Sequence, residues 1–471
     1  MNMSRRPFLL MTSAALLGAT MTARAQPAAF LGDWFATLVV GAARLRLRLN
    51  IGEGPRATLY SIDQGNTPIP ASAIRVESTK LRIEWQVLGA TYEGMLAGDA
   101  ITGIFTQGRG FDLVFKRTAA ADRAPDEVVV LPLTQQRLAA LRARAGAPAM
   151  MAAARNPAGR SLSLVDGLRM LGNQAPVTTA DKWHVGSCTK SMTATLVARL
   201  AEAGLISWSD TVGSVLGAAI PGLHPAYRDA GYLHLLSHHS GLPGNIPLTE
   251  LVRFPRESTD AREDRKRYAT IALQSAPAGE RGKHYEYSNS GYVVAGAMLE
   301  ARTGQPWEEL ARRHLFEPLG MKGAGFGAPG TPGLVDQPSG HNVGATGTVT
   351  AFAPGSPITD NPVVIGPAGR VHATATDILS YLEAHARKSA FLSAESWKRL
   401  HTPPFGGTHA LGWERYGETI WHNGSNTLWY AEIQADLARG TVAIAATNDG
   451  RLESAQLSVE TALKEALAAV S

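Results

Sequence analysis

The chain has 471 residues, of which 45% are hydrophobic and 18% are charged. This length and apolar fraction predict two or three folded domains and exclude an intrinsically disordered chain, which needs low hydrophobicity and high net charge. The formal net charge is only +5, and no basic stretch is interleaved with aromatic residues, so nucleic acid is not an expected partner. The single cysteine, Cys188, excludes an internal disulfide and a cysteine-rich metal site.

Residues 1–25 are predicted to form an export signal. Arg5 and Arg6 precede a modest apolar run, which is too short to cross a membrane as a folded span and closes on small residues at Ala25. A twin arginine in this position is typical of export after folding. We expect cleavage after Ala25 and a periplasmic or secreted mature protein. No later stretch reaches the roughly 20 apolar residues that span a bilayer, so no integral membrane segment is expected.

Residues 26–118 are predicted to form a small antiparallel β-domain. Apolar and polar residues alternate there with a period of two, most clearly over 44–51, 81–87 and 111–115. Clusters of glycine, proline, aspartate and asparagine separate these runs. The pattern predicts six to eight strands in a barrel or sandwich. Residues 119–127, which are small and charged, are expected to be a linker.

Residues 128–471 have a different order of predicted elements, with strands at both ends of the segment and helices between them. This order predicts an α+β sandwich, in which one antiparallel sheet is built from the two chain ends and covered by helices. The predicted strands are 149–154, 162–170, 420–436 and 442–447, and the predicted terminal helices are 134–145 and 453–469.

The first motif in this domain is Ser187-x-x-Lys190, which opens a helix whose residues Met192, Leu196, Leu200 and Ala203 are expected to face the core. Residues three apart share a helix face, so the lysine amine can reach the serine hydroxyl. A serine is a weak nucleophile until a base takes its proton. A single Ser-x-x-Lys also occurs where a serine caps a helix beside a surface lysine. Cys188 is expected to be a core residue rather than a reactive one.

The second motif is Tyr287-Ser288-Asn289. A phenol and a lysine amine both have solution pKa values of about 10. Either Tyr287 or Lys190 can serve as the base only if proximity and burial shift the pKa values of the pair toward neutrality. The sequence leaves this choice open. Asn289 is expected to orient the substrate or Lys190.

Ser-x-x-Lys followed by Tyr-x-Asn resembles the serine β-lactamase and penicillin-binding-protein superfamily, closest in pattern to class C β-lactamases and to their esterase and D-amino-acid peptidase relatives. The resemblance covers about residues 128–470. It implies two-step acyl transfer through an acyl-enzyme on Ser187, with no metal or organic cofactor. Further segments also resemble this family: 235–242, 277–279 and 318–321.

The family's third motif, Lys-Thr-Gly, is absent from the sequence. Arg302-Thr303-Gly304 is chemically similar, but Gly304 stands where a helix C-cap belongs. Among three His-x-Gly triplets, only His422-Asn423-Gly424 follows Tyr287 in a strand-like run. The resemblance implies that this triplet lines the site and that backbone N–H groups of Ser187 and Ser425 hold the oxyanion.

His422 favours esters or peptides without a free carboxylate, because an imidazole with a pKa near 6.5 carries less charge than lysine. The predicted function is therefore an esterase or D-amino-acid peptidase that acts on a small-molecule or peptide acyl donor. A class C β-lactamase or D-Ala-D-Ala carboxypeptidase is the alternative, and a non-catalytic envelope binding protein is another. A metal at His238-His239 is not expected, since no third ligand accompanies the pair. The sequence predicts no oligomeric state.

Overall fold

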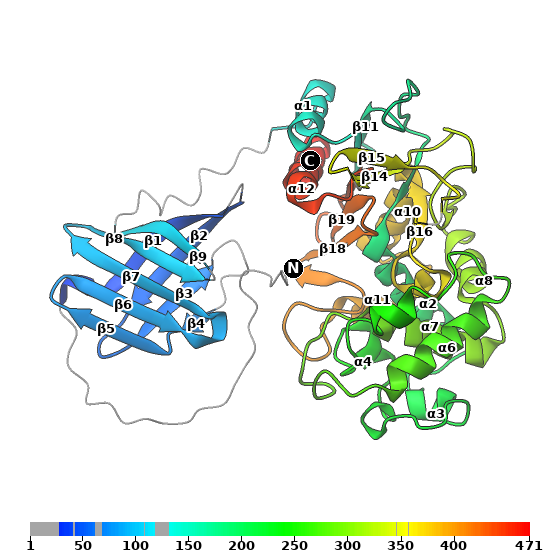
Figure 1. The fold of residues 1–471 in the computed structure, drawn as a ribbon, viewed down its shortest axis with the longest axis horizontal. Coiled ribbons are helices and arrows are strands. Elements are labelled where there is room, and N and C mark those ends of the chain that lie inside the picture. The colour runs from blue at the N-terminus through cyan, green and yellow to red at the C-terminus, as the bar shows by residue number, and fades with distance from the viewer. Residues whose placement is uncertain are drawn as a thin grey trace. The chain divides into compact units, whose positions relative to one another are not determined.

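The computed structural model describes residues 28–471 except 41–42, 62–67, 108, 118–130, 345 and 357. The chain divides into two compact units, Met1–Val129 and Val130–Ser471, which we describe separately (Figure 1). The predicted export signal and the predicted linker at 119–127 lie outside the described residues.

The smaller unit contains one antiparallel sheet with the strand order β4-β3-β2-β1-β9-β8-β7-β6-β5. Its described residues form nine strands rather than the predicted six to eight. The additional strand, β4, is short and proline-containing, and it lies at the sheet edge, where a missing N–H is tolerated. The strands are β1 (Gly32–Val40), β2 (Ala43–Ile51), β3 (Ala57–Ser61), β4 (Pro68–Pro70), β5 (Ala73–Glu77), β6 (Lys80–Trp85), β7 (Ala90–Ala97), β8 (Ala100–Gln107) and β9 (Arg109–Lys116).

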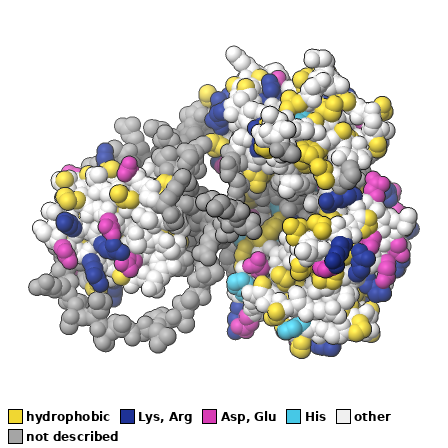
Figure 2. Space-filling model, in the orientation of Figure 1, with side chains coloured by type: hydrophobic (Ala, Val, Ile, Leu, Met, Phe, Trp, Pro, Cys, Tyr) yellow, Lys and Arg dark blue, Asp and Glu magenta, His cyan; other side chains and the backbone are white. Residues whose placement is uncertain are grey.

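The sheet curls around a single apolar core. The residues between β4 and β5 bridge its two ends, because the Ala71 N–H donates to the Ala57 carbonyl and the Ser72 N–H donates to the Glu84 carbonyl, both at 2.8 Å. Inward-facing side chains alternate with outward-facing ones, as the period of two predicts. On the visible face of this unit, Lys and Arg side chains lie beside Asp and Glu side chains (Figure 2). Large buried side chains fill the interior: Trp34, Trp85, Tyr92 and Phe115.

The larger unit is built on an antiparallel sheet with the order β11-β10-β20-β19-β18-β17. Strands from both chain ends meet where β10 pairs with β20, so the predicted α+β sandwich is confirmed. The strands are β10 (Ala149–Arg155), β11 (Ser161–Gly167), β17 (Glu414–Tyr416), β18 (Thr419–Ser425), β19 (Tyr430–Asp436) and β20 (Val442–Thr447).

The predicted single strand 420–436 is wrong, because it is a hairpin. The chain turns between β18 and β19, where the Asn426 side-chain oxygen accepts the N–H groups of Leu428 at 3.1 Å and Trp429 at 3.2 Å. Thr427 has a φ of 75°. The turn contains neither glycine nor proline, and its sequence signal is Asn426 alone, a residue type that commonly forms turns through its side chain.

Helices cover both faces of this sheet. α1 (Gln135–Ala145) and α12 (Leu452–Val470) share one apolar cluster with β10 and β20. The opposite face carries the remaining helices, including α2 (Thr189–Glu202), α7 (Asn289–Thr303) and α10 (Ala375–Ala386) (Figure 1). The predicted core residues of α2 are buried except the last, Ala203, which is exposed because the helix ends before it.

The larger unit contains further helices and short strands. They are α3 (Val212–Leu216), α4 (Tyr232–Leu236), α5 (Leu248–Leu251), α6 (Ala261–Gln274), α8 (Trp307–Ala311), α9 (Gly366–Gly369), α11 (Ala394–His401), and the short strands β12 (Lys182–His184), β13 (Gly325–Phe326), β14 (Gly340–Val343), β15 (Val349–Phe352) and β16 (Val371–Thr374). Gly304 caps α7 with a φ of 71°, as the sequence predicts. No helix in the described part of the chain is long and apolar enough to cross a membrane.

Candidate active site

Ser187 lies in a tight turn between β12 and the buried helix α2. Two glycines allow β18 to pack directly against this turn. A Cβ atom on Gly186 would lie 2.4 Å from the Ser425 backbone nitrogen, and one on Gly424 would lie 2.5 Å from the Ser187 backbone nitrogen. Any larger residue would clash at either position. The two N–H groups expected to hold an oxyanion therefore belong to backbone segments in contact.

Lys190 is fully buried, and its Nζ atom contacts three oxygen atoms. These are Ser187 Oγ at 2.9 Å, Asn289 Oδ1 at 2.7 Å and the Ala368 carbonyl at 2.7 Å. None of these partners is a carboxylate. Burial lowers the pKa of Lys190 to about 7, because no anion compensates the charged form for its lost hydration. A large fraction of this lysine is therefore neutral at physiological pH.

The three contacts also orient the neutral amine. A carbonyl oxygen accepts hydrogen bonds and cannot donate them, so the two N–H bonds of neutral Lys190 point to Asn289 and Ala368. The nitrogen lone pair is then left for the Ser187 hydroxyl, which is the geometry of a base in contact with its nucleophile.

Tyr287 lies over this pair, with its ring centroid 4.9 Å from Lys190 Nζ. Desolvation raises the pKa of Tyr287 above its ordinary value, and a hydrogen bond with Ser187 offsets only part of that rise. Because 41% of the residue is exposed, water reduces the shift without reversing its direction. The phenol keeps its proton at neutral pH and is a hydrogen-bond donor rather than a base.

His238 holds Tyr287 in place. We did not predict this role from the sequence, in which His238 drew attention as a possible metal ligand and as part of the segment 235–242. Its ring stacks on Tyr287 at 4.4 Å between centroids, and its Nδ1 atom accepts the Ser288 N–H at 3.0 Å. Burial, together with Lys190, lowers the pKa of His238 well below its ordinary value. Within the described residues, no group of three or more His, Cys, Asp or Glu side chains is arranged to hold a metal ion.

His422 lies on β18 and is buried. Burial, together with the nearby Lys190, lowers its pKa to about 4, so the ordinary value near 6.5 that we assumed for His422 is wrong for the folded protein. The Asn423 carbonyl accepts a hydrogen bond from Nδ1, which leaves Nε2 of the neutral ring without a proton. The His422 side chain does not line the pocket described next; the neighbouring Gly424 and Ser425 meet the Ser187 turn instead.

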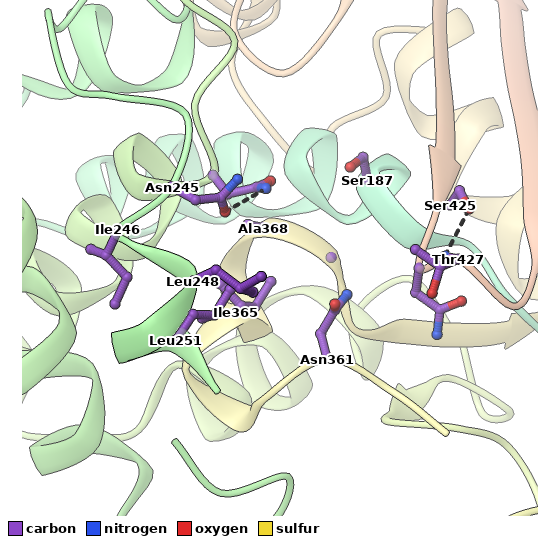
Figure 3. A pocket seen from close by; sticks show the side chains of 13 residues that line it. Ser187, Asn245, Ile246, Leu248, Leu251, Asn361, Ile365, Ala368, Ser425 and Thr427 are labelled. Carbon is purple, nitrogen blue, oxygen red and sulfur yellow. Dashed lines mark hydrogen bonds between the residues drawn. The ribbon is translucent and has the colours of Figure 1, made fainter. Parts of the chain in front are cut away.

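A pocket of about 350 Å³ opens beside Ser187. Figure 3 shows its two ends: Ser425 and Thr427 on one side of Ser187, and a group of aliphatic side chains on the other. No lining residue carries a charge. The pocket is lined by Ser187, Asn245, Ile246, Leu248, Leu251, Asn289, Asn361, Ile365, Ala368, Gly369, Ser425, Asn426 and Thr427.

Behind the polar end lies a buried carboxylate, Asp360, which the sequence did not reveal. It contacts His184 Nε2 at 3.2 Å, Arg370 Nε at 3.1 Å and Asn426 Nδ2 at 2.9 Å. Burial opposes its ionisation, but His184 and Arg370 outweigh that effect and hold the pKa of Asp360 below its ordinary value. These contacts join the segment before Ser187 to the segment after Ser425. No residue pattern in the sequence marks such a junction.

Together these features define the fold class of the serine β-lactamases and penicillin-binding proteins: a sheet from both chain ends, a serine at the start of a buried helix, and a lysine one turn further on. The chain belongs to the beta-lactamase family, whose profile matches residues 134–468. The resemblance inferred from the motifs is thereby confirmed.

Relatives of known name agree with this placement. Penicillin-binding protein 4 of Amycolatopsis lactamdurans is 31% identical over 230 residues, which cover 47% of this chain and 55% of the relative. The D-alanyl-D-alanine-carboxypeptidase/endopeptidase AmpH of Escherichia coli K12 is 26% identical over 223 residues, covering 46% and 52%. The chain thus matches about half the length of these curated relatives.

Among solved structures, the D-amino acid amidase of Ochrobactrum anthropi SV3, crystallised with L-phenylalanine amide, has a TM-score of 0.58 and 22% sequence identity. The likeness covers 72% of this chain and 97% of the amidase. At this identity it shows the shared fold.

Proposed function

We propose that this protein is a serine hydrolase that cleaves ester or amide bonds through an acyl-enzyme on Ser187. The observation that carries the proposal is the set of contacts around Lys190 Nζ, because it presents a neutral amine lone pair to the serine hydroxyl. In the first step Ser187 Oγ bonds to the substrate carbonyl carbon while its proton moves to Lys190. The N–H groups of Ser187 and Ser425 stabilise the resulting oxyanion.

The leaving group then departs and needs a proton. The Tyr287 hydroxyl, which keeps its proton and bonds to Ser187, donates to that group and is reprotonated by Lys190. Water next attacks the acyl-enzyme carbonyl and gives its proton to Lys190. The bond to Ser187 Oγ then breaks, the acid departs, and Lys190 returns the proton to Ser187 Oγ, which restores both groups. Asn289 holds Lys190 in place throughout. These roles assign Lys190 as the base and Tyr287 as the donor.

The pocket favours acyl donors without a free carboxylate. A carboxylate is best held by a lysine or arginine, whereas the pocket is lined only by neutral side chains and His422 is neutral with a pKa of about 4. We therefore propose an esterase or D-amino-acid amidase or peptidase type of activity. The similarity to an amidase fold supports this choice.

A D-Ala-D-Ala carboxypeptidase or a β-lactamase is the second candidate, and the names of the relatives favour it. A non-catalytic envelope protein is disfavoured, because a binding module has no need of a buried, neutral lysine against a serine. The twin arginine at the N-terminus supports our proposal that the enzyme acts in the periplasm or outside the cell.

The experiment is a labelling assay with a fluorophosphonate, followed by a substrate panel. We expect a covalent adduct on Ser187 that is absent in Ser187→Ala. We also expect hydrolysis of p-nitrophenyl acetate or D-amino acid amides to exceed that of nitrocefin. No adduct on Ser187 would overturn the mechanism, and faster turnover of nitrocefin than of every ester and amide would favour the second candidate.

A further inference from the structure

One end of the pocket beside Ser187 is apolar, and its side chains come from two separate segments. Ile246, Leu248 and Leu251 belong to α5 and the loop before it, and Ile365 immediately precedes α9. Figure 3 shows these four side chains grouped at one end of the pocket, away from Ser425 and Thr427. Ile246 and Ile365 are each 4% exposed and form the floor.

The rim of this apolar end is open to solvent. Leu248 is 71% exposed, and Leu251 is half-buried against the main core. A leucine left uncovered at the mouth of a pocket loses contact with water when an apolar group enters beside it, and this favours binding. The arrangement of a buried floor and an exposed apolar rim suits an aliphatic chain.

The apolar end is fixed in position relative to the reacting atoms. The Asn245 side chain accepts a hydrogen bond from Asn289 at 3.0 Å, and Asn289 also bonds to Lys190. On the other side, α9 follows Ile365 and carries the Ala368 carbonyl that bonds to Lys190. Both apolar segments are thus joined to the same lysine.

The two ends of the scissile bond can be assigned from the proton donor. Tyr287, which we propose protonates the leaving group, does not line the pocket, whereas Ser187 does. We therefore place the leaving group outside the pocket and the acyl part of the substrate inside it.

We infer that Ile246, Leu248, Leu251 and Ile365 form an acyl-chain subsite, which makes the enzyme select esters or amides of uncharged aliphatic acids several carbons long. This inference rests on the proposed function. It adds the chemical class of the acyl group, which neither the motifs nor the fold specifies.

The test uses the full chain and two series of esters. In the first series, p-nitrophenyl acetate to p-nitrophenyl hexanoate, the chain grows on the acyl side; in the second, ethyl to hexyl acetate, it grows on the alcohol side. We expect kcat/KM to rise roughly fourfold for each acyl methylene group that the pocket buries, and to change little with the alcohol. Leu251→Asn and Leu248→Asn should reduce the ratio of hexanoate to acetate kcat/KM by about 10-fold or more.

Val252→Asn is the matched control, because Val252 directly follows Leu251, is 61% exposed and does not line the pocket. It should leave the ratio unchanged. A flat acyl series, a steep alcohol series, or a ratio that Leu248 and Leu251 do not influence would overturn the subsite while Ser187 still reacts with fluorophosphonate. Absence of both labelling and ester hydrolysis would instead defeat the proposed function.

Discussion

Lys190 and Arg265 are both fully buried basic residues in the larger unit, but their surroundings differ. Arg265 is paired with Glu300 at 2.7 Å and with Glu308 at 2.6 Å. Burial alone would lower the pKa of Arg265, yet the two carboxylates outweigh it and raise that pKa. Lys190 contacts only neutral oxygen atoms, and its pKa falls to about 7.

This difference separates a structural charge from a reactive one. A buried cation with carboxylate partners stays charged and joins the elements around it, here α6, α7 and α8. A buried basic group without such partners has a lowered pKa and releases its proton easily, because its charged form loses hydration without compensation. Substitutions at the two residues should therefore affect different properties of the protein.

The largest loss of activity is expected on substitution of Ser187, the nucleophile that Lys190 deprotonates. Ser187→Ala should abolish covalent labelling and reduce kcat by at least about 10⁴-fold, as for nucleophiles of other serine hydrolases. Its thermal unfolding should change little, because Ser187 is not the N-cap residue of α2 and alanine fits the same space. Labelling that persists on another serine would show that the nucleophile is assigned wrongly.

Lys190→Met should lower kcat/KM by about 10²–10⁴-fold, the usual range for a lost general base. The substitution should also change how the free energy of unfolding depends on pH. Between about pH 7 and the ordinary lysine value of 10.5, the folded wild type holds fewer protons than the unfolded chain. The free energy of unfolding of the wild type should therefore rise with pH relative to that of Lys190→Met, by up to about 1.4 kcal/mol per pH unit.

Denaturant unfolding of both proteins at pH 7 and pH 9 measures this difference. If the difference in free energy of unfolding between the two proteins is the same at pH 7 and pH 9, Lys190 is charged in the folded protein. It would then not differ from Arg265 in charge state.

Arg265→Met should destabilise the larger unit by about 3–5 kcal/mol, because the buried Glu300 and the partly buried Glu308 are left without a cation. The kcat/KM per folded molecule should stay within a few-fold of wild type, since Arg265 does not line the pocket. Denaturant midpoints together with active-site titration separate these two quantities. A large loss of kcat/KM with unchanged stability would contradict a structural role.

Tyr287→Phe should have the smallest effect on activated esters. p-Nitrophenolate leaves without a proton, so loss of the phenol should cost about 10-fold or less, whereas amides should lose about 10²-fold or more because an amine needs a proton to leave. Comparing a p-nitrophenyl ester with an amide of the same acid measures the ratio. Equal losses on both substrates would show that Tyr287 assists the attack of Ser187 instead.

The sequence predicted what is local or periodic. The i, i+3 spacing placed Lys190 beside Ser187, and the alternation over 44–51 predicted a strand of the smaller unit. Contacts between distant segments were not predictable. The Ala368 carbonyl lies 178 residues from Lys190, and Asp360 lies 66 residues from Asn426; neither pair belongs to a repeating pattern.

The protonation states of His422, Tyr287 and Lys190 could not be predicted from the sequence for a related reason. His422 was expected to titrate near pH 6.5, but its burial on β18 beside Lys190 lowers its pKa to about 4. Likewise, the choice between Tyr287 and Lys190 as base depends on how deeply each group is buried and on which atoms it contacts. Both facts arise only when residues from β18, α2 and α7 come together.

The pH dependence of acylation tests the central claim, a neutral Lys190 as the base, most directly. The second-order rate of fluorophosphonate labelling of Ser187 should be measured from pH 5 to pH 10 in wild type and in Tyr287→Phe. We expect the rate to rise to a plateau with a midpoint near pH 7 in both proteins, because Lys190 loses its proton there. A midpoint near pH 10 in wild type, or one that disappears in Tyr287→Phe, would contradict the account.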